Sequence, residues 1–571
     1  MTNDTNTEKS NEPQLNWQLV QQFWFLVKPY WQSDYKRQAW ILLSLVIFFI
    51  IIMSGVNAYK TYISKWAIDA LNAKDPTAFY NVIYLAVISL TISVPIVAFH
   101  EYYPNKLSLF WRRWANLELL KNYFNANAYY KMSLYSDVDN PDQRIAEDLN
   151  NFVTESTRFF SILSLSIISI IAYIGVLGSI SWTLVLSIFI YALIGTTIIV
   201  YLSRDLVKLN FRNIRYQADY RYNLVHVRDN IESIAFYKGE QHERSVLVKA
   251  FNILFGNFFH LIKLQRNISF ATQTYTLFAA LIPFVLLAPK VFAGDLKVGS
   301  IVQASTVFMI LLTDLSLIIN EFKSLSTLAA TIQRLYGFMK GLDASPPDCN
   351  QIQHASHNTF DFQNVTVFTP KLEKKLVDDL SLTIKPGSGL MIVGASGCGK
   401  SSLLRAVAGL WRNGDGNILS PKLEEIMFLP QKPYMLIGTL REQMIYPHLD
   451  VEITDAQLKQ ALDSVGLNDL VDRVGGLNTV LNWSNVLSLG EQQRVIFLRL
   501  FLTQPKFAIL DESTSALDEP NEAKLYQQLR DSGITYISVG HRSTLLDFHD
   551  DVLQLQNGGN WKLMTVDEYQ R

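Results

Sequence analysis

Residues 159–203 form a long run that contains no Asp, Glu, Lys or Arg. A helix rises about 1.5 Å per residue, and about 20 apolar residues cross the hydrocarbon core of a bilayer. The run is about twice as long as one span requires. It therefore predicts two membrane helices joined by a turn near residues 178–182.

The rest of the N-terminal part of the chain contains further apolar windows of bilayer length. Charged residues make up only 18% of the chain, whereas soluble proteins carry about 25%. We therefore predict an all-α transmembrane domain of six spans over residues 15–340. Buried helices of a soluble protein are the alternative, but several windows of full bilayer length with aromatic residues near their ends argue against it. The expected spans are about 39–58, 80–99, 159–178, 182–203, 267–289 and 298–320.

Basic residues indicate which way these spans run. Lys and Arg are frequent in residues 101–158 and 204–266, and the turn near residue 178 has none. Since basic loops stay in the cytoplasm, both segments and both termini are expected there. Residues 1–14 are polar and predict a disordered tail. The aromatic-rich stretch that follows predicts an amphipathic helix at the membrane interface.

Asp314 is the only acid well within an expected span. Placing an acidic side chain inside a membrane costs free energy, and such residues are usually functional. Asp314 is therefore a candidate for contact with a substrate or with a proton. The alternative is that it lies near a helix end and is wetted by the cavity of the domain.

Composition changes after Lys340. Residues 341–358 are polar, contain adjacent prolines and predict a linker. Residues 359–571 alternate short apolar runs with helical stretches, so an α/β domain is expected there. The two cysteines, Cys349 and Cys398, are too few for a disulfide framework and are expected to be free thiols. The net charge of −1 gives no support for a nucleic-acid partner.

Residues 394–401 read GASGCGKS, a phosphate loop between an apolar strand and a helical stretch. The glycines let successive backbone N–H groups turn toward an anion at a helix N-terminus. Lys400 is expected to reach the β- and γ-phosphates of ATP, and Ser401 is expected to bind Mg²⁺. The residues expected to bind the nucleotide here are Gly394, Ala395, Ser396, Gly397, Cys398, Gly399, Lys400, Ser401 and Ser402.

Residues 507–512 read FAILDE, an apolar strand that ends in two acids. Asp511 is expected to hold the metal and Glu512 to polarise the attacking water. Mere solvation of a strand end would explain two acids as well. Together with the phosphate loop, however, the pair predicts an α/β P-loop ATPase domain.

Residues 486–494, VLSLGEQQR, resemble the signature motif of the ABC-family ATPases, which reads LSGGQ. The resemblance implies that Ser488 and Gly490 contact the γ-phosphate of a nucleotide held by the opposite subunit. Leu489 replaces the first glycine of the motif and adds bulk near the loop. Glu491 replaces the glutamine.

Other positions resemble the same family. The resemblance implies that Gln431 senses the metal and touches the permease, and that the ring of His541 holds the γ-phosphate and its water network. Residues 515–518, SALD, resemble the D-loop. Phe368 stands where the family has an aromatic that stacks on adenine, although a core aromatic of a strand would fit there too. The implied catalytic set is Glu512, His541 and Gln431, and the implied metal set is Ser401, Gln431 and Asp511.

Two permease segments resemble the ABC subfamily D transporters and their bacterial relatives, namely residues 139–149, DNPDQRIAEDL, and residues 231–240, IESIAFYKGE. In the second, Glu232, Phe236 and Gly239 match an EAA-like motif that implies coupling to the ATPase domain. A solvated helix is the alternative. The resemblance implies a cargo such as fatty acyl-CoA, a peptide or cobalamin, and a bacterial inner membrane rather than a peroxisomal one.

Each chain has one phosphate loop and one signature. If each ATP site takes these two motifs from different subunits, as the resemblance implies, a working unit needs two chains. We expect a homodimeric half-transporter in the lipid bilayer that uses ATP and Mg²⁺ to move a bulky or amphipathic solute, by import or export. Two alternatives remain. Leu489 would suit a non-transporting ATPase regulator, and the phosphate loop alone would suit a membrane-anchored kinase or repair-type ATPase.

Overall fold

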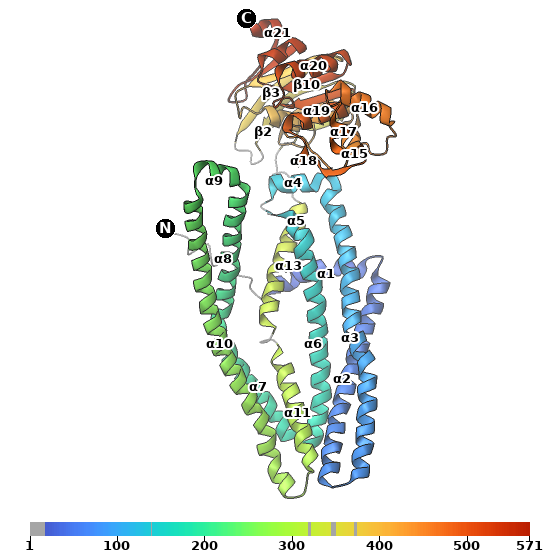
Figure 1. Cartoon of the computed structure of the whole chain (residues 1–571), viewed down its shortest axis with the longest axis vertical. Helices are drawn as coiled ribbons and strands as arrows, with labels where there is room; N and C mark the ends of the chain where they lie inside the picture. Colours follow the sequence, from blue (N-terminus) through green and yellow to red (C-terminus); the bar gives the residue numbers. More distant parts are fainter. Residues whose placement is uncertain (1–16, 137, 139, 318–320, 344–349, 370–373) are drawn as a thin grey trace. The chain divides into compact units, whose positions relative to one another are not determined.

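The computed structural model describes residues 17–571 apart from 137, 139, 318–320, 344–349 and 370–373. The chain forms two compact units (Figure 1). A helical unit comprises Met1–Ala128 and Val138–Leu342, and an α/β unit comprises Tyr129–Asp137 and Asp343–Arg571. The expected disordered tail, residues 1–14, and Cys349 lie outside the described residues.

The helical unit contains six helices that are long and apolar enough to cross a membrane, judged by length and composition over the described residues. They contain the predicted spans 39–58, 80–99, 159–178 and 267–289, whereas the helices Trp182–Leu202 and Val298–Leu315 end before the predicted limits of 203 and 320. Residues 318–320 are not described. The main helices are α1 (Trp17–Gln32), α2 (Lys36–Asn72), α3 (Pro76–Phe124), α6 (Leu149–Ile180), α7 (Trp182–Leu202), α8 (Arg204–Asp229), α9 (Ile231–Tyr237), α10 (Glu240–Phe292), α11 (Val298–Leu315) and α13 (Phe322–Leu342). The six-span prediction is confirmed.

Connections between these helices follow the sequence expectations. The turn in the long uncharged run falls at Ser181, which is extended between α6 and α7. Helices α3 and α10 have 49 and 53 residues. Each is more than twice as long as a membrane span, which needs about 20 residues. Helices α3 and α10 therefore extend beyond the predicted spans into the two basic segments. Helices α8 and α10 run side by side with α9 at their tip (Figure 1).

Small residues allow two close helix contacts in this unit. A Cβ at Gly299 would collide with the Lys65 carbonyl of α2, and the backbone N–H of Gly299 donates to Asp69 Oδ1 at 2.9 Å. Asp69 thus caps the first turn of α11 from a neighbouring helix. A Cβ at Gly195 of α7 would collide with the ring of Tyr275 on α10. These contacts fix how α2 meets α11 and how α7 meets α10.

The α/β unit is built on two main sheets. The six-stranded sheet has the order β12-β11-β4-β10-β9-β6, in which β12 is antiparallel to β11 and the other neighbours are parallel. The four-stranded sheet has the order β1-β5-β2-β3. The strands are β1 (Gln353–Ser356), β2 (Asp361–Phe368), β3 (Lys375–Thr383), β4 (Gly389–Gly394), β5 (Gly414–Ser420), β6 (Ile426–Leu429), β9 (Phe507–Asp511), β10 (Thr535–Val539), β11 (Asp551–Leu555) and β12 (Trp561–Thr565), and β7 (Ile437–Thr439) pairs separately with β8 (Val480–Asn482).

Strand β1 corrects one sequence expectation. It lies within residues 341–358, the predicted linker, yet it pairs in parallel with β5. The polar composition of that segment hid the strand, because β1 sits at the edge of its sheet and three of its four residues are exposed. Residues 344–349 of the same segment lie outside the described part of the chain.

Helices cover the sheets and build the two hydrophobic cores of the α/β unit. One core includes the fully buried side chains of Trp483, Phe497 and Tyr526, and the other centres on Phe360 and Val367. The helices are α14 (Lys400–Val407), α15 (Leu440–Ile445), α16 (Asp455–Ser464), α17 (Leu470–Val474), α18 (Trp483–Val486), α19 (Leu489–Thr503), α20 (Glu519–Asp531) and α21 (Val566–Gln570).

A segment from far up the chain also belongs to the α/β unit. Residues Tyr129–Asp137, which contain most of α4 (Ala128–Tyr135), cluster with it. The hydroxyl of Tyr135 donates to Asn413 Oδ1 at 2.6 Å. The sequence expectation placed this whole segment in a continuous permease domain over residues 15–340. Nothing in the local pattern of the segment signals a contact with a residue 278 positions away.

Candidate ATP-binding and hydrolysis site

Four adjacent strands deliver the predicted residues to one edge of the six-stranded sheet. The order β4-β10-β9-β6 places the loop after Gly394, His541, Asp511 with Glu512, and Gln431 in succession. All four strands are parallel, so their carboxyl ends meet at the same edge, where open α/β sheets bind ligands. The sheet itself therefore assembles residues that are up to 147 positions apart (541 − 394).

The phosphate loop depends on glycine conformations. Gly394, Gly397 and Gly399 have φ values of 149°, 78° and 111°, which L side chains rarely adopt. Lys400 is the first residue of α14, and its Nζ donates to the carbonyls of Gly394 at 2.8 Å and Ala395 at 3.1 Å. The Lys400 ammonium thus lies over the loop. Ala395, Ser396 and Gly397 are exposed, Cys398 and Gly399 are buried, and Ser401 and Ser402 are half-buried.

Ser401 and Asp511 meet across the sheet edge. The Ser401 hydroxyl donates to Asp511 Oδ1 at 3.2 Å. Burial raises the pKa of the Asp511 carboxyl, and the negative charge of Glu512 raises it further. A cation bound between the hydroxyl and the carboxylate would favour the charged form of Asp511. The oxygen donors at this position are of the kind that Mg²⁺ prefers.

Glu512 is held from two sides. Its Oε2 accepts from Gln431 Nε2 at 2.7 Å, and its Oε1 lies 3.0 Å from His541 Nε2. The backbone of Glu512 is left-handed, with φ of 46°, and its N–H donates to Val539 O at 3.0 Å. A left-handed conformation costs a residue with a side chain about 1 kcal/mol. The structure thus brings together all three residues of the predicted catalytic set.

The signature residues begin helix α19. Ser488 is the N-cap, and its hydroxyl accepts from the Glu491 N–H while the Glu491 carboxylate accepts from the Ser488 N–H. This is a capping box. A Cβ at Gly490 would lie 3.2 Å from the Ala516 carbonyl of the predicted D-loop. Leu489 is 47% exposed, so its side chain is not part of the core.

Phe368 ends β2 and is half-buried. Its backbone is fixed, because its carbonyl accepts from Trp411 Nε1 at 2.8 Å and its N–H donates to the Asn413 carbonyl. Phe368 is not among the fully buried core residues. Both interpretations, an aromatic that stacks on adenine and a core aromatic of the strand, stay open.

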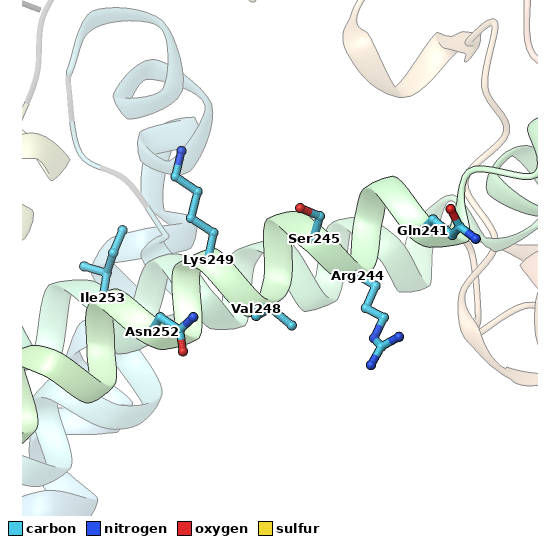
Figure 2. Close-up of a pocket in the computed structure, with 7 residues that line it drawn as sticks. All are labelled: Gln241, Arg244, Ser245, Val248, Lys249, Asn252 and Ile253. Carbon is cyan, nitrogen blue, oxygen red and sulfur yellow. The ribbon is translucent and has the colours of Figure 1, made fainter.

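The residues of the EAA-like motif lie in the helical unit. Glu232 and Phe236 are on α9, where Phe236 is 84% exposed, and Gly239 immediately precedes α10. The N–H of Gly239 donates to the Ile234 carbonyl at 2.9 Å, which makes a tight corner between α9 and α10. The solvent side of α10 has a shallow hollow (Figure 2), lined by Gln241, Arg244, Ser245, Val248, Lys249, Asn252 and Ile253.

Asp314 is the next-to-last residue of α11. Its Oδ1 accepts from the Ser166 hydroxyl of α6 at 3.2 Å. Its Oδ2 is buried and makes no hydrogen bond within the described part of the chain. Both sequence readings of Asp314 therefore retain support, because it is close to a helix end and also has an unpaired carboxylate oxygen.

Two family models match the chain. The model for ABC transporter transmembrane region 2 matches residues 26–292, and the model for ABC transporter matches residues 377–515. An uncharacterised ABC transporter ATP-binding protein of Synechocystis is 40% identical over 92% of this chain and 82% of its own length. The chain belongs to the ABC transporter family. As an ABC transporter it is a multi-pass membrane protein that binds ATP and couples its hydrolysis to transport of a solute.

Eukaryotic members of the family are also similar over nearly the whole chain. The chloroplastic ABC transporter D family member 2 of Arabidopsis thaliana is 35% identical over 98% of this chain and 90% of its own length. The lysosomal cobalamin transporter of Homo sapiens is 31% identical over 97% of both chains. The predicted resemblance to ABC subfamily D and its bacterial relatives is therefore confirmed.

Sequence reasoning did not give Glu491 a contact and did not single out Arg473. Arg473 Nη2 of α17 lies 2.6 Å from Glu491 Oε1. The capping half of this arrangement had a signal, because a serine followed three residues later by a glutamate before an apolar run is the pattern of a capping box. The Arg473 half had none, since the pair depends on how α17 packs.

Proposed function

We propose that two copies of this ABC transporter form a homodimer with two composite ATP sites, which moves a bulky or amphipathic solute across a bacterial inner membrane. The observation that carries the proposal is the sheet edge that joins Lys400, Asp511, Glu512, Gln431 and His541 in one chain. Each chain supplies one such edge and one signature helix. Two chains in opposite orientation therefore supply two complete sites.

In this proposal Lys400 leaves the loop carbonyls and contacts the β- and γ-phosphates, because phosphate oxygens are stronger acceptors for an ammonium group. Ser401, Asp511 and Gln431 hold Mg²⁺, which when bound supplies positive charge that balances the phosphate oxygens. The Glu512 carboxylate accepts a proton from the attacking water. Gln431 and His541 keep that carboxylate in place, as their contacts of 2.7 and 3.0 Å indicate.

The other nucleotide contacts in the proposal come from two chains. The Phe368 ring stacks on adenine in the chain that holds the phosphates, which agrees with its partial exposure. Ser488 and Gly490 of the second chain meet the γ-phosphate. Their place at the start of α19 supports this role, because backbone N–H groups at a helix N-terminus bind anions.

We propose that movement passes between the ATPase and the permease through two segments. Glu232, Phe236 and Gly239 form one, and the 84% exposure of Phe236 supports it, since an exposed aromatic at a helical corner is suited to docking. The segment Tyr129–Asp137 forms the other, supported by the hydrogen bond from Tyr135 to Asn413. Gln431 would sense both the metal and the permease.

The solute class rests on relatives. One similar protein is named as a cobalamin transporter, and the resemblance to subfamily D also allows fatty acyl-CoA or a peptide. All three solutes are bulky, and bulkiness is the one property of them that we propose for the solute of this chain. Asp314 is a candidate contact for a polar group of the solute because its buried Oδ2 has no hydrogen bond to any residue that the structure describes.

Hydrolysis of MgATP by the purified protein in lipid vesicles tests the proposal. Glu512→Gln should lower turnover by about 100-fold or more, since it removes a general base. Glu424→Gln, which changes an exposed glutamate just before β6, is the matched control and should behave like the wild type. A wild type without turnover that recovers activity on Leu489→Gly would instead support the regulator. Transfer of phosphate to an acceptor other than water would support the kinase.

A further inference from the structure

The Glu491 carboxylate accepts from three donors at the start of α19. It accepts from the Ser488 N–H at 2.9 Å, from the Ser488 hydroxyl at 3.1 Å and from Arg473 Nη2 at 2.6 Å. Only 14% of the Glu491 side chain is exposed, compared with 44% of Arg473. Although burial opposes ionisation, the hydrogen bonds from Ser488 and the charge of Arg473 hold the pKa of Glu491 below its ordinary value.

This arrangement creates a conflict if Ser488 also binds ATP, which is the part of the proposed function on which the inference rests. A serine hydroxyl has one proton to donate, and here it goes to Glu491. A phosphate oxygen that took the same proton would lie within about 6 Å of the carboxylate, two hydrogen-bond lengths away. Two negative charges at that separation in a water-poor interface repel each other.

We propose that Arg473 is a positioning residue that neutralises Glu491, so that Ser488 can turn its hydroxyl toward the γ-phosphate held by the partner subunit. Arg473 and Ser488 bind different oxygens of the carboxylate, because Arg473 binds Oε1 whereas Ser488 binds Oε2. Arg473 can therefore keep Glu491 in place while the Ser488 hydroxyl changes partner. The Ser488 oxygen still accepts from the Glu491 N–H, so the helix stays capped.

The glutamate in this signature is therefore matched to an arginine elsewhere in the domain. A glutamine would not need the arginine, since a neutral amide caps the helix equally well and does not repel a phosphate. A purely structural role for the pair makes the opposite forecast. In that case the double variant, which lacks both Arg473 and the Glu491 charge, would be at least as impaired as the variant that lacks Arg473 alone.

The test compares Arg473→Gln, Glu491→Gln and the double variant in MgATP hydrolysis by the full-length protein in lipid vesicles. Arg473→Gln should raise KM for ATP about three- to tenfold while kcat changes less than about twofold, the signature of weakened binding. The double variant should return KM to within about twofold of the wild type. Arg473→Lys, which keeps the charge, should stay near the wild type. Lys506→Gln breaks an exposed ion pair with Glu425 at the opposite end of β9 and should change nothing.

The same substitutions in a Glu512→Gln background are compared by the ATP concentration that half-saturates binding, a readout that needs no turnover. An unchanged affinity in Arg473→Gln, or a double variant as weak as the single one, overturns the inference. If either result occurs while Glu512→Gln still abolishes hydrolysis of the parent protein, the proposed function stands and only the inference fails. If the parent protein does not hydrolyse MgATP, the proposed function fails. The ATP-binding measurements in the Glu512→Gln background then test the inference without any need for hydrolysis.

Discussion

Glu512 shows what the sequence could and could not reveal about single residues. Its proposed role, as the acid beside an Asp511 expected to bind the metal, is predicted by the linear pattern FAILDE after a phosphate loop. Its left-handed backbone and its two contacts, to Gln431 and His541, are not, because the three residues come from different strands. Motifs that are continuous in sequence were predictable. Contacts that depend on packing, such as Arg473 with Glu491, were not.

His549 allows a prediction at the same scale about pH. It is buried in contact with the rings of Tyr526 and Tyr536, and its Nδ1 donates to the Leu545 carbonyl at 2.7 Å. Burial lowers the pKa of His549 to about 4 from 6.5. Above pH 6.5 the ring is neutral in folded and unfolded chains alike. As pH falls from 6.5 to about 4 only the unfolded chain takes up the proton, which destabilises the α/β unit by up to about 3 kcal/mol.

Thermal unfolding of the full-length protein between pH 7 and pH 4.5 checks this. His549→Asn keeps a donor for the Leu545 carbonyl but cannot titrate, so its melting temperature should fall less steeply with pH than that of the wild type. His448→Asn replaces an exposed histidine and should leave the slope as it is. Parallel slopes for wild type and His549→Asn would show that His549 does not carry the effect.

Among the secondary-structure elements, the six membrane helices were predictable because the bilayer restricts their length and composition. A span must be long and nearly free of charge, so the six windows could be recognised without reference to their neighbours. The short elements β1 and α4 escaped, since their place is set by β5 and by Asn413 rather than by their own composition. The burial of a residue and its pairing partner are properties of the fold. A polar edge strand has no periodic sequence pattern from which the strand could be predicted.

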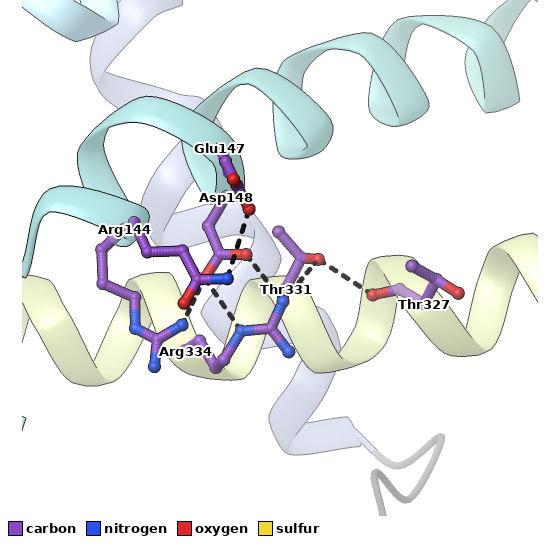
Figure 3. Close-up of polar contacts among 7 residues, drawn as sticks. Arg144, Glu147, Asp148, Thr327, Thr331 and Arg334 are labelled. Carbon is purple, nitrogen blue, oxygen red and sulfur yellow. Dashed lines mark hydrogen bonds and ion pairs between the residues drawn. The ribbon is translucent and has the colours of Figure 1, made fainter. Parts of the chain in front are cut away.

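A buried ion cluster in the helical unit carries a prediction about two elements. Asp148 ends η3 (Arg144–Asp148) just before α6, and its carboxylate accepts from Arg144 at 2.8 Å and from two nitrogens of Arg334 on α13 at 2.8 and 2.6 Å (Figure 3). The Asp148 side chain is 3% exposed. Asp148→Asn would leave two guanidinium groups facing an uncharged amide.

Loss of one partner of a buried ion pair destabilises by about 3 kcal/mol. We therefore expect Asp148→Asn to lower the melting temperature of the purified protein by several degrees. Tryptophan fluorescence during heating measures the unfolding. Asp142→Asn, at an exposed aspartate of the same segment, should melt with the wild type. If both variants melt with the wild type, the cluster does not hold η3 to α13.

At the scale of the whole molecule, the chain is an ABC transporter with one permease region and one ATPase region. The helical unit and the α/β unit each have their own core. Fold class, the number of spans and the ATPase motifs were all predictable from one sequence. The homodimer is a different kind of statement. It is a proposal that rests on the one phosphate loop and one signature in each chain, and on the proposed sharing of each ATP site between two chains.

A complementation experiment with two damaged chains tests whether the ATP sites are shared between two copies of the chain. Chains with Lys400→Ala and chains with Ser488→Arg, each carrying a different affinity tag, are co-expressed, and the mixed dimer is purified through both tags. Each variant alone should be inactive, whereas the mixed dimer contains one site free of both lesions and should recover about half of the wild-type MgATP hydrolysis per dimer. A mixed dimer as inactive as either variant alone would contradict the composite site, as would full turnover by an isolated wild-type monomer.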